Sequence, residues 1–223
     1  MVTAGLWMDE VTTERESFAS EELGEVLSHY DVGVIHSAKE FTRGSRRAPK
    51  LLLDTPTGRY LLKRRATGKD DPFKVAFAHA LMGHLRARKF PVPRLIGTCD
   101  DQNSMLQLRG RVYELFEFVD GERYDSSLEA TLASGRALAH YHAAVEDFST
   151  EWTPPAGSYH AAPNVRAGLN AIPTVTSSHD SVVGHEAELL HLTQLLHEQY
   201  DEVADDVNRG GFHRWPATII HGD

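Results

Sequence analysis

Two groups of residues have types and spacing suited to phosphate chemistry. Lys63 ends the apolar run Tyr60-Leu61-Leu62, so its ammonium could point into a cleft as a cation for phosphate oxygens. Taken alone, such a lysine is more often a surface residue of a basic run, here Lys63-Arg64-Arg65. Asp223 ends a His-Gly-Asp tripeptide that follows two isoleucines. This order is typical of a strand that enters a catalytic loop, where a carboxylate accepts a hydroxyl proton.

Several other chemistries are excluded by spacing. No glycine-rich dinucleotide motif, phosphate-binding loop or nucleophile elbow occurs in the chain. His185 and His197 are each followed by glutamate, but neither has the second histidine of a zinc-binding helix motif. The single cysteine, Cys99, forms no internal disulfide and agrees with a reducing compartment. We therefore expect no metal ligands in these motifs.

Composition and charge define the class of protein. The chain has 223 residues, is 41% hydrophobic and 25% charged, and has a net charge of −9. It contains neither a membrane-length apolar run nor a signal-peptide pattern, so we expect a cytoplasmic globular protein with no membrane partner. Residues 39–111 contain 17 Lys and Arg against 6 Asp and Glu, whereas residues 112–223 contain 5 against 18. This asymmetry indicates that the first half meets an anion, and that the second meets a cation or only water.

Periodicity predicts an α+β protein with two lobes. A small, mostly antiparallel sheet with one long helix comes first, an extended crossing segment follows, and a helical region comes last. We expect a cleft between the lobes. The predicted strands are residues 31–35, 50–54, 59–64, 104–108 and 111–119. The predicted helices are a short one within residues 1–29, one opened by Asp71-Pro72, one from Ser126 to Val145 and one over 189–207, with a loop at 153–178.

Five segments, in this order, resemble the aminoglycoside phosphotransferase and type II homoserine kinase-like family, whose members have the protein-kinase-like fold. The segments are GRYLLK at 58–63, residues 84–93 ending in FPVP, YELFEFVDG at 113–121, GRALAHYH at 135–142 and IIHGD at 219–223. The resemblance covers nearly the whole chain from about residue 31 onward. It implies a nucleotide-binding lobe over residues 1–119, a hinge near 117–121 and a partial helical lobe over 120–223.

The resemblance also implies a site for ATP and Mg²⁺. Lys63 would bind the nucleotide phosphates beneath a loop that contains Gly44 and Ser45. Adenine would bond to the backbone of Glu117 and Val119, which we expect to be free of a sheet partner, with Phe116 behind it. Asp223 would be the catalytic aspartate that orients or deprotonates the hydroxyl of a small-molecule acceptor. The acidic second half favours an acceptor with an amine, such as an amino alcohol, an aminoglycoside or a choline-like molecule.

The sequence departs from the family at two points. Residues 72–98 contain no Asp or Glu, so the helix after Lys63 lacks the glutamate that usually pairs with this lysine, and His79 or His84 could face the cleft instead. The family's magnesium ligands follow the His-Gly-Asp motif, at which this chain ends. We therefore expect an N-terminal portion of a kinase that is inactive alone.

A non-catalytic, pseudokinase-like nucleotide-binding module is the alternative that the departures favour. Nucleic-acid binding through the basic stretch 43–65 is disfavoured, because the chain is acidic and this stretch has only one aromatic residue, Tyr60.

Overall fold

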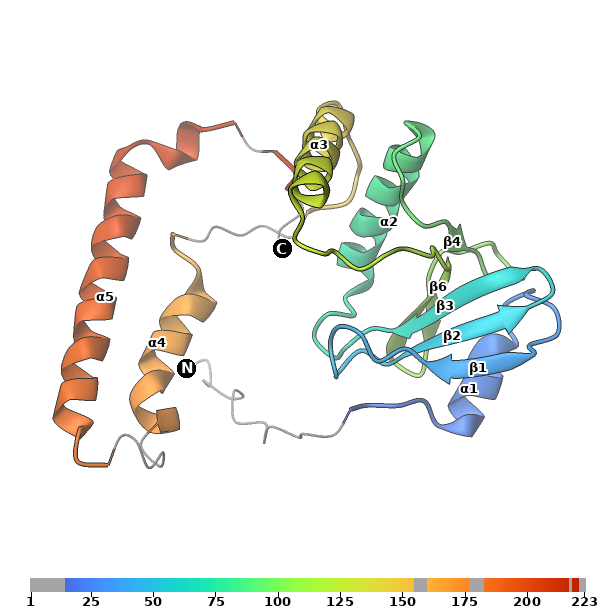
Figure 1. The fold of residues 1–223 in the computed structure, drawn as a ribbon, viewed down its shortest axis with the longest axis horizontal. Coiled ribbons are helices and arrows are strands. Elements are labelled where there is room, and N and C mark those ends of the chain that lie inside the picture. Colours follow the sequence, from blue (N-terminus) through green and yellow to red (C-terminus); the bar gives the residue numbers. More distant parts are fainter. Residues whose placement is uncertain (1–14, 155–159, 177–182, 217, 221–223) are drawn as a thin grey trace. The chain divides into compact units, whose positions relative to one another are not determined.

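A computed structural model describes residues 15–154, 160–176, 183–216 and 218–220 (Figure 1). The described residues form two compact units, one of residues 15–154 with 219–220 and one of residues 160–216 with 218. The first unit contains α1 (Ser20–Leu27), β1 (Ser37–Glu40), β2 (Lys50–Thr55), β3 (Gly58–Arg64), α2 (Pro72–Ala87), β4 (Leu95–Ile96), β5 (Leu106–Leu108), β6 (Arg111–Glu117) and α3 (Leu128–Val145). The second contains α4 (Pro163–Thr176), α5 (Glu186–Arg209) and the 3₁₀ turn η1 (Phe212–Arg214).

The first unit is built on an antiparallel sheet in the order β1-β2-β3-β6-β4, with β5 also paired to β6. Its two tight hairpins follow from local sequence. The turn between β5 and β6 places Arg109 and Gly110 at φ of 50° and 73°, the conformation that a two-residue hairpin requires. The predicted strands at 50–54 and 59–64 therefore pair as one hairpin, and those at 104–108 and 111–119 pair as the other.

The expectation of a first strand at residues 31–35 was wrong. Gly33 has a φ of 71°, which interrupts the extended backbone, while Val32 is buried in the core. The strand begins later, where Ser37 pairs with Asp54 of β2. The loop before β2 is correspondingly shorter than predicted.

The sheet is covered on both faces, and this decides which side chains can meet. Leu62 and Leu115 are fully buried in a cluster with Val26 of α1. On the opposite face, Val112 packs against Val75 of α2. Because successive side chains of a strand point to opposite faces, the residues of β3 and β6 that alternate with this leucine core lie on the α2 side.

Helix α2 begins as predicted and packs against α3. The Asp71 carboxylate accepts a hydrogen bond from the amide of Phe73 at 3.0 Å, and Pro72 occupies the first turn. The contact with α3 is made by Leu85, Tyr141 and Val145. Thus α3 packs with the sheet-containing unit.

Two details of α3 differ from expectation. Its cap is Ser127, whose hydroxyl accepts from the amide of Ala130, because Ser126 has a positive φ of 62°. Leu128, Leu132 and Leu138, which form the apolar stripe of the predicted helix, are exposed, since only the C-terminal end of the helix meets α2. Periodicity identified an apolar stripe, but it could not show how much of that stripe is covered.

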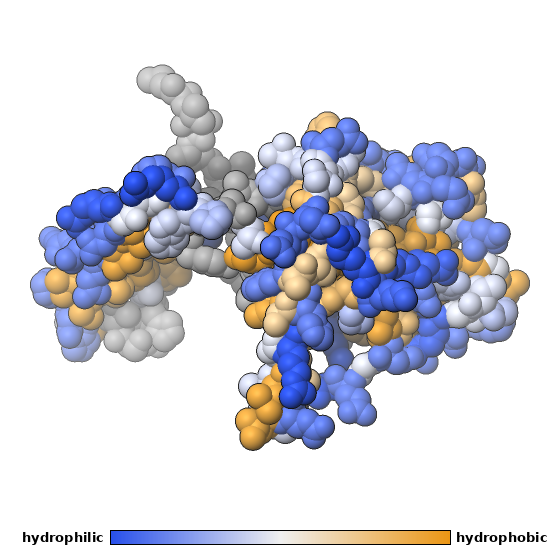
Figure 2. Space-filling model, turned by 90° about the horizontal axis from the view of Figure 1, so that it is seen from above, coloured by the Kyte–Doolittle hydropathy of each residue, from blue (hydrophilic) through white to orange (hydrophobic). Residues whose placement is uncertain are grey.

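The second unit is a pair of helices. Helix α4 lies within the predicted loop at 153–178, so that expectation was wrong. Its proline, Pro173, concealed the helix pattern, while Tyr200 of α5 donates to the Ala162 carbonyl at the start of α4 at 3.1 Å. Leu192 and Leu196 of α5 are exposed, and hydrophobic side chains are visible on this unit in Figure 2. None of the helices in the described ranges is long and apolar enough to span a membrane.

The core assignment predicts unequal effects of two leucine truncations. Leu62→Ala removes a fully buried side chain and should lower the opening free energy of the sheet by about 2–5 kcal/mol. Leu128→Ala removes a side chain that is 76% exposed and should change it by less than about 0.5 kcal/mol. Hydrogen exchange of the most protected amides of β3 and β6 measures both. Equal effects would contradict the assigned core.

Candidate functional site

Lys63 and Glu114 are cross-strand partners at the α2 side of the sheet. Lys63 in β3 pairs in register with Glu114 in β6, and the Lys63 Nζ lies 3.5 Å from the Glu114 Oε2. The side chain of Glu114 is 1% exposed, whereas that of Lys63 is 27% exposed. The lysine therefore has its counter-ion inside the protein and keeps access to solvent for its own ammonium hydrogens.

Glu114 has two further partners that keep it ionised. Arg65 donates from Nε to Oε2 at 2.8 Å and from Nη2 to Oε1 at 2.7 Å. His79 Nε2 lies 2.7 Å from Oε1. Burial opposes ionisation of this carboxyl, but the hydrogen bonds from His79 and Arg65, together with the charges of Lys63 and Arg65, lower its pKa to about 2.

His79 connects α2 to this carboxylate. An ionised carboxylate only accepts hydrogen bonds, so the proton in the contact must belong to His79 Nε2. The other ring nitrogen, Nδ1, lies 2.7 Å from the hydroxyl of Ser104, which can donate to it. The imidazole thus fills the space between the helix and the strand, with both nitrogens satisfied.

The expectation that Lys63 lacks an acidic partner applies only to the helix. The partner comes from the neighbouring strand, and His79 of α2 bonds to that partner from the buried side. His84 does not take this place, because its Nε2 lies 2.9 Å from the carbonyl of Ala144 in α3. The missed signal was alternation in β6, where Glu114 interrupts the apolar run from Val112 to Phe116.

Gly44 lies close to a second lysine beside Lys63. Lys50 of β2 is the cross-strand partner of Lys63, and its Nζ donates to the Arg43 carbonyl at 2.9 Å. Burial, followed by the charge of Lys63, lowers the pKa of Lys50. Gly44 has a φ of 81°, and a Cβ there would approach the Lys50 Nζ to 3.2 Å. The structure therefore brings Gly44, Lys50 and Lys63 together.

Ser45 makes a local contact in the same loop, accepting from the amide of Arg47 at 3.2 Å. Lys50 was missed by the sequence analysis. The register of the hairpin, once its turn is placed at residues 56–57, is the signal that puts it opposite Lys63.

The backbone of residues 117–119 is less free than predicted. The amide of Glu117 donates to the Arg94 carbonyl, and that of Phe118 donates to the Arg59 carbonyl, each at 2.8 Å. Hydrogen bonding thus continues past the end of β6, which corrects the expectation of an unpartnered segment. Within the described residues, the Val119 amide has no acceptor. Phe116 is half-buried and pairs in register with Leu61 and Leu95.

An ion pair fixes the segment after β6. Arg59 Nη1 donates to both carboxylate oxygens of Asp120, at 2.7 and 2.8 Å. The Arg59 guanidinium also lies 4.6 Å from the centre of the Phe118 ring, which meets Phe41 edge-on. These contacts join residues 117–120 to β3 and to the start of the loop that contains Gly44.

Asp223 lies outside the described residues. Nearby, Ile219 packs against the cluster of Leu85, Tyr141 and Val145. In the part of the chain that the structure describes, no three His, Cys, Asp or Glu side chains are placed to hold a metal ion.

Comparison with known proteins identifies the class of this arrangement. The model of the phosphotransferase enzyme family matches residues 37–223. The chain belongs to this family. An antiparallel sheet with Lys63 at its centre, followed by helices, agrees with that fold.

The relatives include homoserine kinases and small-molecule kinases. Homoserine kinase of Brucella anthropi is 32% identical over 132 residues, which are 57% of this chain and 39% of that enzyme. Spectinomycin phosphotransferase, solved with ADP and spectinomycin, aligns with a TM-score of 0.58 at 15% identity over 92% of this chain and 63% of its own. A microcompartment-associated aminopropanol kinase aligns with a TM-score of 0.54 at 16% identity, over 70% of this chain and 54% of its own. The match thus spans about two fifths of the homoserine kinase.

Glu114→Gln tests the buried carboxylate through the pH dependence of stability. Folding lowers the pKa of Glu114 from 4.5 to about 2, so its ionised form stabilises the folded state at pH values above 4.5. This stabilisation is lost as the pH falls toward about 2. The free energy of unfolding of the wild type should therefore exceed that of the variant by about 3 kcal/mol at pH 7. The difference should shrink below pH of about 4.5, since a protonated glutamate and a glutamine are both neutral.

Denaturant titrations of both proteins from pH 7 down to the lowest pH at which they stay folded measure this difference. A gap that stays constant with pH would contradict the assigned ionisation.

Proposed function

We propose that this chain is the nucleotide-binding portion of an ATP-dependent small-molecule kinase. The observation that supports this most is Lys63, which is ion-paired to buried Glu114 at 3.5 Å and still accessible beside Lys50 and Gly44. A cation held from behind by a buried carboxylate has a fixed position. A fixed cation suits an anionic group such as a nucleotide phosphate.

The phosphates would lie between Lys63 and the loop containing Gly44 and Ser45. Lys50 adds a second ammonium, which would exchange its hydrogen bond to the Arg43 carbonyl for one to a phosphate oxygen. The missing Cβ of Gly44 leaves room for this ammonium. We therefore assign Lys50 to the proposed phosphate site together with the residues predicted from sequence.

The adenine ring would lie against residues 116–119. The Val119 amide has no acceptor among the described residues, so it is available to a ring nitrogen, and the Glu117 carbonyl would accept from the exocyclic amine. Phe116 would close the inner end of the pocket. The bonds from Glu117 and Phe118 to neighbouring carbonyls hold this backbone in place before a ligand arrives.

Asp223 would orient the acceptor hydroxyl or take its proton. When bound, Mg²⁺ would neutralise charge on the transferred phosphoryl group. We propose that its ligands are not among the described residues. A non-catalytic binding module is the second candidate, favoured by the same observation.

The acceptor would be a small alcohol with an amine. The homoserine kinase that the chain resembles and the aminopropanol kinase that shares its fold are both named for such acceptors. Residues 112–223 contain 18 acidic against 5 basic residues, and this negative charge would attract a cationic acceptor to the protein. We propose that the protein acts in the cytoplasm. We propose no nucleic-acid or membrane partner.

Lys63→Ala tests the nucleotide site. Loss of a charge-assisted contact to phosphate should weaken binding of ATP to the chain by about 10- to 100-fold, measured by titration calorimetry. Lys74→Ala is the matched control, because Lys74 is 61% exposed and its ion pair with Asp71 is long, at 3.9 Å. Equal affinity of Lys63→Ala and wild type would overturn the assignment.

The acceptor class is tested on the protein purified from its native source. With ATP and Mg²⁺, homoserine and 1-amino-2-propanol should yield O-phosphorylated products by mass spectrometry, while the analogues lacking the hydroxyl should not. Glycerol, which lacks the amine, should react at least about tenfold more slowly, because one charge contact contributes roughly 1.4 kcal/mol. ATP binding without any phosphorylated product would favour the non-catalytic module instead.

A further inference from the structure

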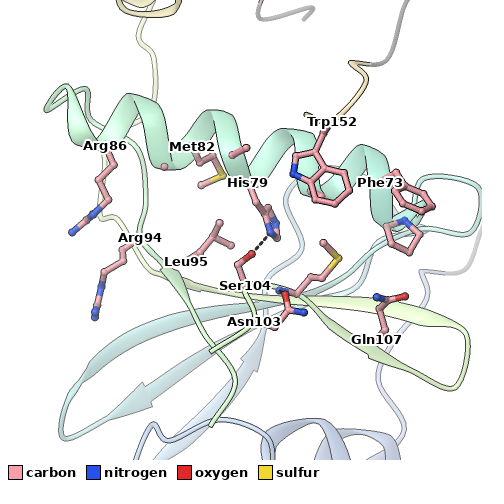
Figure 3. Close-up of a pocket in the computed structure, with 15 residues that line it drawn as sticks. Phe73, His79, Met82, Arg86, Arg94, Leu95, Asn103, Ser104, Gln107 and Trp152 are labelled. Atoms are coloured by element: carbon pink, nitrogen blue, oxygen red, sulfur yellow. Dashed lines mark hydrogen bonds between the residues drawn. The ribbon is translucent and has the colours of Figure 1, made fainter. Parts of the chain in front are cut away.

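A hollow lies on the side of His79 that faces away from Glu114. It is formed between α2 and the residues from Arg94 to Gln107, and Trp152 closes one end (Figure 3). Its volume is about 820 Å³, within the range of small-molecule sites. Gly44, Lys50, Lys63 and residues 116–119 do not line it, so this hollow is separate from the proposed nucleotide site.

The hollow has an apolar end and a cationic end. Phe73 and Trp152, whose ring centres are 6.0 Å apart, form the apolar end, and the thioether of Met82 lines the middle. Arg86 and Arg94 lie next to each other at the opposite end (Figure 3). A ligand that fills this space must therefore be apolar along one part and polar or charged at the other.

The charged side chains that line the hollow are two arginines. Among the described residues that line it, none is aspartate or glutamate. Arg94 shares its charge with Glu117, whose Oε2 accepts from Arg94 Nε at 3.2 Å, but Arg86 forms no ion pair with any described carboxylate. In a chain with a net charge of −9, two arginines without a lining carboxylate would favour an anion over a cation.

The floor of the hollow adds neutral hydrogen-bonding groups. Asn103, Ser104 and Gln107 lie along it, and the Ser104 hydroxyl is bonded to His79 at 2.7 Å. His79 itself is 8% exposed and bonds to Glu114 with its other nitrogen. The floor thus ends at a residue that already contacts the partner of Lys63.

We propose that this hollow is a second ligand site, which takes a small organic carboxylate with an apolar body. The carboxylate would bind Arg86 and Arg94, since a guanidinium fork matches the two carboxylate oxygens. The apolar body would lie against Met82, Phe73 and Trp152, where aromatic and thioether groups favour a flat ring. The site does not depend on the proposed kinase function.

Methyl NMR tests the proposal directly. Two of the chain's four methionines, Met82 and Met105, line the hollow, so labelling the methionine methyl groups with ¹³C places reporters inside it. Their signals are assigned with Met82→Leu and Met105→Leu. The probe is 3-phenylpropionate, compared with 3-phenylpropan-1-ol and 3-phenylpropylamine, which have the same apolar body but a neutral or cationic end.

The expected result is a saturable shift of both methyl signals with 3-phenylpropionate, at least about tenfold tighter than with the alcohol and absent with the amine. Arg86→Gln should remove this preference for the anion. Arg136→Gln is the matched control, an exposed arginine of α3 that does not line the hollow, and it should leave binding unchanged. Phe73→Gln should weaken binding of both 3-phenylpropionate and 3-phenylpropan-1-ol, because it removes the apolar end.

Several outcomes would overturn the proposal. Absence of a saturable shift would mean that the hollow takes no such ligand. Equal affinity for the anion and the alcohol would indicate an apolar peptide or a second copy of the chain as the occupant. Loss of the methyl shifts in the Lys63→Ala variant would place the anion in the proposed nucleotide site instead. Because Arg86 and Phe73 are exposed, both variants are expected to fold, and their unliganded methyl spectra show whether they do.

Discussion

The structure of the first unit depends on one buried charge. Glu114 is fully enclosed, and an unpaired carboxylate there would cost several kcal/mol. Arg65, His79 and Lys63 offset this cost, and they come from the connection after β3, from α2 and from β3 itself. Satisfying one carboxylate therefore fixes the helix, the sheet and the lysine relative to one another. Removing any of these partners would leave charge or a donor unsatisfied at the centre of the sheet.

This arrangement places the negative charge on a strand and leaves α2 without acids. The strand is rigid, since β6 is paired on both sides, so the counter-ion of Lys63 does not move with the helix. The helix contributes a histidine instead, which donates to Glu114 and needs no charge to do so. One consequence is that the outer side of α2, where Arg86 lies, has an excess of positive charge. The absence of an acidic residue from α2 thus affects both the lysine site and the hollow that His79 lines.

Two findings define what can be proposed about function, namely the family of the chain and the part of its relatives that it matches. The family model matches residues 37–223, whereas the 132 residues that align with the homoserine kinase from Brucella anthropi are only 39% of that enzyme. The described residues contain a cationic site joined to a glycine-containing loop and a backbone segment held in place by hydrogen bonds. They contain no metal-binding cluster. Nucleotide binding and phosphoryl transfer are therefore two separate proposals, each with its own test.

The sequence by itself determined what depends on neighbouring residues. It predicted the hairpin turns, the Asp71 cap of α2 and the apolar strands around Lys63, because backbone conformation and strand alternation are local. It missed α4, where a proline interrupts the pattern, and it misjudged α3, because exposure depends on what packs against a helix. Only the tertiary structure decided that Glu114 faces Lys63 and His79, residues 51 and 35 positions away, since sheet register and helix packing bring together groups that no local pattern relates.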